Sequence, residues 1–197
     1  KVYLVFGSAL VGGGIFDLGS PTTSAYQWTG EALGDELGIS VSAAGDVDGD
    51  SLADFVLGAH NASPGGAYSG RAYLVLSSSL GSPGTQSAAS ISHRFDGEGS
   101  GEFAGTSVAG GGDVDGDGQA DLLVGAPSAD GEGFGAGRAY LWLGASLASP
   151  GTYELADADV IFEGTADNEQ AGEVVRFADD LDGDGRSEVM VGSLSGS

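Results

Sequence analysis

The sequence predicts an all-β fold built from a repeating unit, and two observations carry this prediction. A nine-residue pattern of alternating acidic residues begins at Asp46, Asp113 and Asp180, so that successive copies start 67 residues apart. Glycine makes up 38 of the 197 residues, and no long stretch repeats its apolar residues at the helical period. A fixed period of this length is typical of repeat architectures, with helix expected to be nearly absent.

Each unit is predicted to begin with two strands on either side of the acidic pattern. A glycine stands eight residues before each first aspartate and is followed by the first predicted strand, at residues 39–41, 106–108 and 173–175. A short apolar run follows each pattern, at residues 54–59, 121–126 and 188–193. These runs are brief, rich in aliphatic residues and contain a glycine near their end, which predicts a second, buried strand.

Two more strands complete the predicted unit. Large residues alternate in a third segment, which occurs at residues 71–76 and 138–143 and again at residues 1–6. A fourth element ends at Gly30, Gly97 and Gly164, again 67 residues apart. Each unit therefore holds four short strands. Four-stranded units repeated at this length are typical of β-propeller blades.

The acidic pattern itself predicts a cation site in each unit. Carboxylates stand at positions 1, 3, 5 and 9 of every copy, and groups this close repel one another unless a cation neutralises them. Calcium accepts six to eight oxygen ligands in flexible geometry, whereas zinc and copper favour the cysteine and histidine ligands that the pattern lacks. We predict three Ca²⁺ sites, with carboxylates from Asp46, Asp48, Asp50 and Asp54, from Asp113, Asp115, Asp117 and Asp121, and from Asp180, Asp182, Asp184 and Glu188.

The rest of each loop is predicted by analogy with other aspartate-rich calcium loops. The backbone carbonyl at position 7 would complete the metal shell, which selects Leu52, Gln119 and Arg186. Glycine at positions 4 and 6 allows the tight curl, but Ser51 replaces the second glycine of the first loop. A positive φ there costs a non-glycine residue about 1 kcal/mol or more, so the first site is expected to be the weakest.

Two other interpretations of the acidic pattern are less favoured. An EF-hand needs a glutamate at position 12, where this chain has Leu57, Val124 and Val191 inside the apolar runs. A solvated Asp-Gly turn would explain one isolated copy, but three copies in one register favour metal binding.

These residues resemble the FG-GAP repeat, the blade unit of the integrin α-subunit propeller, in which Phe-Gly-x-Ser-Val precedes a calcium loop and a strand ending Gly-Ala-Pro. The second unit matches best, at residues 105–108, 113–118, 121–127 and 137–140. The first unit ends Gly58-Ala59-His60 without the proline, and the third carries Glu188 and ends at Leu194. The resemblance implies blades of four antiparallel strands, with calcium-loaded hairpins on one face and ligands on the other.

The resemblance implies one propeller region over residues 1–197 with three blade equivalents, because the ends would form a split blade. The expected units are a partial blade at 1–30, full blades at 31–97 and 98–164, and a partial blade at 165–197. Propellers generally need four or more blades. Two interpretations remain, a fragment of a longer propeller or a homodimer that completes a six-bladed ring. The ring is slightly favoured, since a half disc exposes long sheet edges.

Charge and length restrict the partners and the compartment. The formal net charge is −23, with 29 acidic and 6 basic residues, and three calcium ions would leave it strongly negative. Such a surface repels nucleic acid and anionic membranes, and no apolar stretch approaches the roughly 18–20 residues that span a bilayer. Loops of this kind suit the high calcium outside cells, so an extracellular location is expected.

The leading functional hypothesis is a calcium-stabilised adhesion or binding module with no catalytic residues. Variable loops would contact a protein or carbohydrate ligand, at residues 8–25, 61–70, 77–90, 128–137 and 145–157. The alternative is the propeller part of a secreted polysaccharide-active or other hydrolytic enzyme. Only His60 and His93 could act as a neutral-pH base, and no Gly-x-Ser-x-Gly nucleophile motif accompanies them. We expect His60 to pack or turn the chain, His93 to lie on the surface, and the large aromatic residues to pack between blades.

Overall fold

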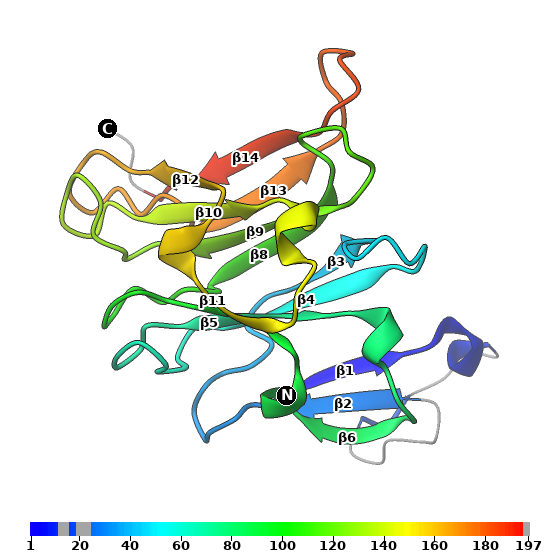
Figure 1. Ribbon diagram of the computed structural model, residues 1–197. Coiled ribbons are helices and arrows are strands. Elements are labelled where there is room, and N and C mark those ends of the chain that lie inside the picture. Colours follow the sequence, from blue (N-terminus) through cyan, green and yellow to red (C-terminus); the bar gives the residue numbers. More distant parts are fainter. Residues whose placement is uncertain (12–15, 19–24, 195–197) are drawn as a thin grey trace.

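The computed structural model describes residues 1–11, 16–18 and 25–194 and confirms the all-β class (Figure 1). Short 3-10 turns are the only helical pieces within these ranges. The strands are β1 (Val2–Val5), β2 (Ala25–Thr29), β3 (Val41–Gly45), β4 (Asp54–Ala59), β5 (Arg71–Val75), β6 (Gly84–Ser87), β7 (His93–Asp96), β8 (Ser107–Gly112), β9 (Asp121–Ala126), β10 (Arg138–Trp142), β11 (Gly151–Glu154), β12 (Val160–Glu163), β13 (Val174–Ala178) and β14 (Glu188–Gly192).

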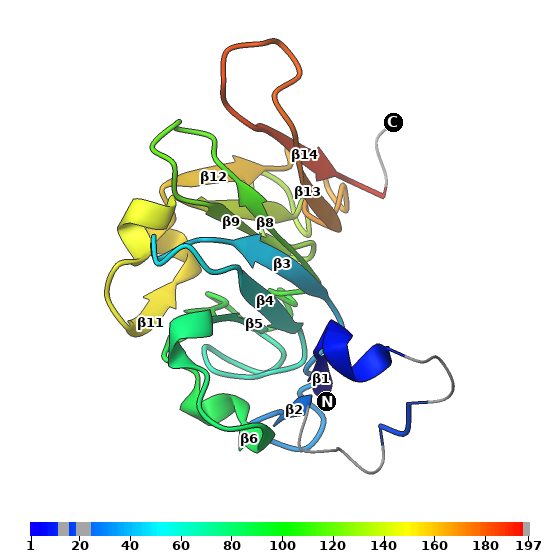
Figure 2. The same cartoon turned by 90° about the vertical axis from the view of Figure 1, so that its right-hand side faces the viewer.

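The described strands form four sheets whose order follows the repeat. The two central sheets have the orders β11-β7-β5-β4-β3 and β12-β10-β9-β8, and they contain the four antiparallel strands predicted for residues 31–97 and 98–164. The other sheets are β1-β2-β6 and the hairpin β13-β14. The inner strands β3, β8 and β13 lie next to one another, so that successive sheets stack as in Figures 1 and 2.

Two strands were missed, and they lie where the sequence predicted variable loops. Within residues 77–90 the chain forms β6, which pairs in parallel with β2 of the preceding sheet. Within residues 145–157 it forms β11, which pairs in parallel with β7 in the same way. These two connections between a third and a fourth strand therefore each add an outer strand to the preceding sheet. Short Gly-Thr-containing segments carry too little periodicity to be recognised as strands.

The cores lie between the stacked sheets, and adjacent residues of one strand face different cores. Val56 of β4 packs toward the third sheet, whereas Leu57 packs toward the first. The central sheets are thus covered on both faces. The predicted packing residues Trp28, Phe95 and Trp142 are buried, and the ring of Phe103 contacts those of His60 and Tyr68.

The glycines in the second strands β4 and β9 let neighbouring sheets approach closely. A Cβ atom on Gly58 would lie 2.0 Å from the carbonyl oxygen of Gly105, and one on Gly125 would lie 2.0 Å from that of Gly172. No side chain fits at either position. The glycine that the sequence pattern repeats is therefore needed for sheet stacking, not only to end a strand.

The described sheets do not close into a ring, so the propeller and its blade number stay predictions. β1 pairs only with β2, and β14 only with β13, within the described chain. Part of the first predicted variable loop, residues 12–15 and 19–24, lies outside the described residues. No helix of the described chain has the length and apolar character needed to cross a membrane.

Candidate metal centres

The three acidic loops are the hairpin connections β3–β4, β8–β9 and β13–β14. Because the inner strands lie side by side, the loops project from the same side of the stacked sheets, on the right in Figure 1. One end of the molecule therefore carries all fifteen residues predicted to bind metal.

Carboxylate oxygens converge in each loop, and together they offer the hard oxygen ligands that calcium prefers. In each group one ligand atom per residue lies within 4.8 Å of all the others. The groups are Asp46, Asp48 and Asp50; Asp113, Asp115 and Asp121; and Asp180, Asp182, Asp184 and Glu188. Asp54 and Asp117 are not brought into their groups at this distance, so their role as ligands stays a prediction.

Backbone N–H groups hold the carboxylate at position 1 in each loop, with three donors in the second and third loops and two, from Asp50 and Ser51, in the first. The Asp113 carboxylate accepts hydrogen bonds from Gly116, Asp117 and Gly118, at 2.7–3.2 Å. Asp180 accepts the equivalent three bonds, two of which come from glycines. These backbone donors lower the pKa of the Asp180 carboxyl below its usual value, so it is ionised and ready for a cation.

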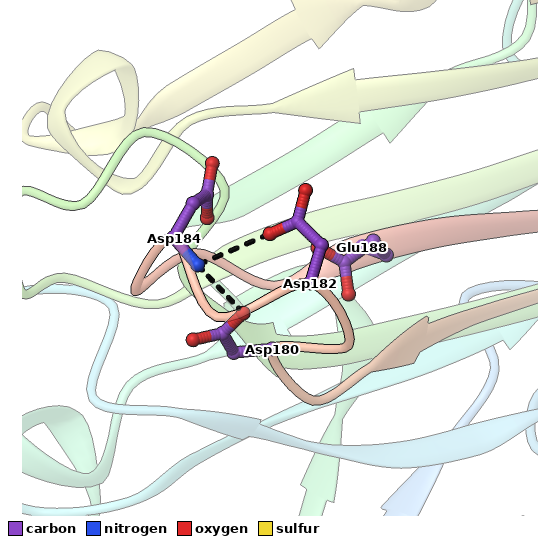
Figure 3. Close-up of side chains that lie close together, drawn as sticks. All are labelled: Asp180, Asp182, Asp184 and Glu188. Carbon is purple, nitrogen blue, oxygen red and sulfur yellow. Dashed lines mark hydrogen bonds between the residues drawn. The ribbon is translucent and has the colours of Figure 1, made fainter.

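Figure 3 shows how the backbone of the third loop curls around its carboxylates. The N–H of Asp184 donates to Asp180 Oδ1 at 3.1 Å and to Asp182 Oδ1 at 3.1 Å, the two dashed lines of the figure. Asp50 and Asp117 make the matching pairs of bonds in the other loops. The nine residues thus encode one conformation three times.

The backbone confirms the predicted need for positive φ. The glycines at position 4 have φ values of 76°, 78° and 85°. At position 6, Gly118 and Gly185 have φ values of 90° and 89°, and Ser51 takes 69° in the same place. Ser51 is therefore strained as expected, while the ranking of the three affinities stays a prediction.

The carboxylate at position 9 anchors the loop to the rest of its sheet. Asp121 is 0% exposed; it accepts a bond from the Val114 N–H at 2.7 Å and one from the Gly144 N–H at 2.9 Å. Asp54 does the same with Val47 and Ser77. Burial raises the pKa of both carboxyls above the usual value, and their backbone donors oppose that rise. A bound cation would favour the charged form that burial disfavours.

Glu188 fulfils only part of this role in the third loop. Its carboxylate accepts a bond from the Leu181 N–H at 2.6 Å, which matches the bonds from Val47 and Val114. The structure gives it no bond from a residue that follows a third strand, because no third strand lies beside β14 in the described chain. The Glu188 side chain therefore accepts the hydrogen bond from its own loop and lacks the second one, from the residue after a third strand.

Neighbouring loops are linked through their backbones, a feature that the sequence did not reveal. The N–H of Ala120 donates to the carbonyl of Asp46 at 2.8 Å, and the N–H of Ser187 donates to the carbonyl of Asp113 at 2.8 Å. Position 8 of one loop thus binds position 1 of the loop before it. A cation that orders one loop would stiffen its neighbour through this bond.

The position-7 residues lie at the loop tips. The N–H groups of Leu52, Gln119 and Arg186 each donate to the position-5 carboxylate, at 2.7–2.9 Å. These bonds place position 7 beside the carboxylate cluster. Whether their carbonyl groups face a metal ion stays a prediction.

An acidic hollow of about 770 Å³ lies at the opposite end of the second sheet. It is formed by the connections β2–β3 and β4–β5, and Glu31, Leu33, Glu36, Tyr68 and Arg71 help to line it. Leu33 and Tyr68 are exposed, with relative areas of 107% and 53%. Only part of this region, the predicted loop at 61–70, was recognised from the sequence.

A repeated ion-pair network supports this end of the sheets. The Arg71 guanidinium binds Asp96 at 2.7 Å and Glu31 at 2.6 Å, and the Tyr73 hydroxyl also donates to Glu31. One unit later, Arg138 binds Glu163 and Glu98, and the Tyr140 hydroxyl donates to Glu98. The recurring Arg-Ala-Tyr sequence was the only sign of this network in the sequence. The acidic partners of its arginine and tyrosine lie 25 to 42 residues away, so they could not be identified from it.

The two histidines lie in different surroundings. His93 was expected on the surface, but it is 1% exposed and shares a hydrogen bond with the Leu147 carbonyl. Burial lowers its pKa. The sequence-based prediction failed because β11 and the 3-10 turn that precedes it cover His93 of β7. His60 contacts Glu36, Thr106 and the ring of Phe103, in keeping with the predicted packing role.

Comparison with known families agrees with this geometry. The FG-GAP repeat family model matches residues 37–75 and 104–142, each of which spans β3–β5 or β8–β10 with its acidic loop. No curated protein matches the chain significantly. The hairpins, their stacking glycines and the family match agree, and the chain contains two FG-GAP repeats of the kind found in integrin-like propellers.

Proposed function

We propose that this chain is a calcium-stabilised, non-catalytic binding module of an extracellular protein, with blades arranged as in an integrin-like propeller. The observation that carries the proposal is the division between its two ends. Three equivalent carboxylate loops occupy one end, and an open hollow with exposed apolar groups occupies the other. Metal at the loop end would hold the hairpins rigid, and the hollow would contact the ligand.

The hollow favours a basic segment of a protein as the ligand. Glu31, Asp35 and Glu36 lie around it, and Arg71 is already paired with two carboxylates. Leu33 and Tyr68 add apolar surface beside these charges. A lysine or arginine side chain would place its charge near the acids and its methylene groups against Leu33. A neutral glycan would use the apolar surface but not the charge.

The proposed use of the hollow is tested by binding of an arginine-containing peptide library and a neutral glycan array to the calcium-loaded protein. Leu33→Ser and Glu36→Gln should each weaken binding of the selected peptide, by roughly fivefold or more. Leu181→Ser, which changes an exposed side chain of the third metal loop, is the matched control and should leave binding unchanged. Equal loss in all three variants would contradict binding at the hollow, and selection of glycans alone would contradict the basic ligand.

A further inference from the structure

The first and second metal loops are joined by a backbone hydrogen bond. The N–H of Ala120, at position 8 of the second loop, donates to the carbonyl of Asp46, at position 1 of the first loop, at 2.8 Å. The strands that lead into these loops, β3 and β8, lie side by side. The same bond recurs between the second and third loops, from Ser187 to Asp113. The end of one acidic loop is thus tied to the beginning of the loop before it.

Close packing reinforces this hydrogen bond. Gly45 directly precedes Asp46, and a Cβ atom on Gly45 would lie 2.7 Å from the Cβ of Ala120 and 3.0 Å from the Cα of Gly111. The Ala120 side chain is buried between these backbones. Because no free space separates Ala120 from Gly45, a shift of Ala120 toward the first loop must also move the backbone that carries Asp46.

Gly144, just after β10, contacts both loops from a third direction. Its N–H donates to the Asp121 carboxylate, at position 9 of the second loop, at 2.9 Å. A Cβ atom on Gly144 would lie 2.7 Å from the carbonyl oxygen of Ala120 and 3.3 Å from that of Val47, at position 2 of the first loop. Gly144 has no positive φ, so the lack of space favours glycine there. The second loop is therefore held against the first by the chain that follows the third strand.

The contact reaches the residue around which the first loop curls. The Asp46 carboxylate accepts hydrogen bonds from the N–H of Asp50 at 3.0 Å and from that of Ser51 at 2.8 Å. The carbonyl of the same residue accepts the bond from Ala120. A change of the second loop that moves Ala120 is therefore transmitted to a predicted metal ligand of the first loop.

We propose that the first and second metal loops bind calcium cooperatively, with Ala120 as the positioning residue that links the second loop to Asp46 of the first. This inference rests on the calcium binding proposed above. A cation in the second loop would fix its nine residues in one arrangement and keep the Ala120 N–H directed at Asp46. Because coupling between sites is reciprocal, a cation in the first loop would raise the affinity of the second by the same factor. The two hairpins would then become rigid together over a narrow range of calcium concentration.

Electrostatic repulsion between the cations acts in the opposite direction. Two divalent cations repel one another, so charge alone would make a cation in one loop weaken binding in the other. Salt screens this repulsion, with a decay length of about 8 Å at physiological ionic strength, whereas the hydrogen bond and the packing at Ala120 are contacts that salt does not screen in this way. The sign of the coupling therefore distinguishes the two effects.

Calcium titration followed by NMR tests the coupling at physiological ionic strength. The amide signals of Gly49 and Gly116, at position 4 of the two loops, report the first and second sites separately. Asp115→Asn removes a predicted ligand of the second loop and should weaken calcium binding at the first site roughly fivefold or more, as measured at Gly49. An unchanged or higher affinity of the first site in this variant would overturn the cooperative binding.

A double-mutant cycle tests the role of Ala120. Ala120→Pro removes the N–H that binds Asp46, so adding Asp115→Asn to this variant should change the affinity of the first site by less than about twofold. Ser187→Pro is the matched control, because it removes the same N–H from position 8 of the third loop. Asp115→Asn should keep its full effect there. Equal effects in the two backgrounds would overturn transmission through Ala120, since a pure charge effect would be the same in both.

A measurement without metal separates this inference from the proposed function. Absence of calcium-dependent shifts at both loops would contradict the proposed function, but amide hydrogen exchange in chelator would still report the contact. Ala120→Pro should speed the exchange of the Asp50 and Ser51 N–H groups, and Ser187→Pro should leave it unchanged. Ala120→Gly, which removes only the methyl group packed against Gly45, is a milder variant and should give a smaller increase. Unchanged exchange in both Ala120 variants would overturn the link between the loops.

Discussion

The second and third acidic loops have the same backbone conformation in different surroundings. Asp113 and Asp180 accept equivalent N–H bonds, and the glycines at position 6 share nearly the same φ. Asp121 is fully buried and anchored twice, whereas Glu188 is half-buried and anchored once. The curl of a loop is therefore a local property of nine residues, but its attachment to the fold depends on the strand beside it.

Removal of calcium should have the largest effect on both loops. Binding to the folded state alone contributes about 4 kcal/mol per site at a thousandfold excess over Kd, which corresponds to a Tm shift of about 10 °C or more. Calorimetry in calcium and in chelator measures it, with magnesium as the control ion. An unchanged Tm in chelator would show that calcium does not contribute to the stability of the fold.

Loss of the buried anchor should affect the second loop much more than the third. Asp121→Ala leaves the N–H groups of Val114 and Gly144 without their partner, and unsatisfied buried groups cost about 1–3 kcal/mol each. Glu188→Ala frees a single N–H near solvent, so its effect should be clearly smaller. Urea denaturation in saturating calcium measures both variants. Equal destabilisation would show that the surroundings do not distinguish the two anchors.

The first loop allows a sharper test of the local contribution. Ser51→Gly should relieve a positive φ of 69° and raise stability and first-site affinity by about 1 kcal/mol. Gly118→Ser makes the opposite change in the second loop and should lower both by a similar amount. Calcium titration of the two variants measures the affinity of each altered site. A weaker first site in Ser51→Gly would contradict the predicted ranking of the loops.

The smallest expected effect is a pH dependence from His93. Burial lowers its pKa in the folded state below the unfolded value of 6.5, so the unfolded chain binds the proton first as the pH falls. The contribution of neutral His93 to the free energy of unfolding is thus complete above about pH 6.5. It decreases as the pH falls toward the pKa of His93 in the folded state. The Tm difference between the unmodified protein and His93→Gln should narrow at acidic pH in saturating calcium. A constant difference would contradict this account.

Much of the fold was predictable because each repeat contributes its own evidence. The strand pattern, the all-β class and the positive φ at Ser51 follow from residues that recur at one spacing. The site was predictable at the level of its carboxylates, which the structure gathers into three clusters. These features are local, so a short window of sequence contains the necessary information.

The features that were missed depend on contacts between units. β6 and β11 gain their strand character from the edges of β2 and β7, and nothing in their own residues alternates strongly. The burial of His93 results from that added strand. The bonds from Ala120 to Asp46 and from Ser187 to Asp113 use backbone groups, which leave no trace in the sequence. Tertiary contacts of this kind override local propensity.

The parallel outer strand also imposes an order on the growing chain. The outer edge of β7 at His93 stays open until Gly151 and the rest of β11 have been synthesised, because β11 covers that edge. At common rates of translation this interval lasts roughly 3–12 s, long enough for an uncovered strand to meet another nascent chain. Arg94 within β7 and the high negative charge would disfavour such encounters. β11 thus links neighbouring units in the finished protein. During synthesis it is also the last strand to pair with the edge of β7.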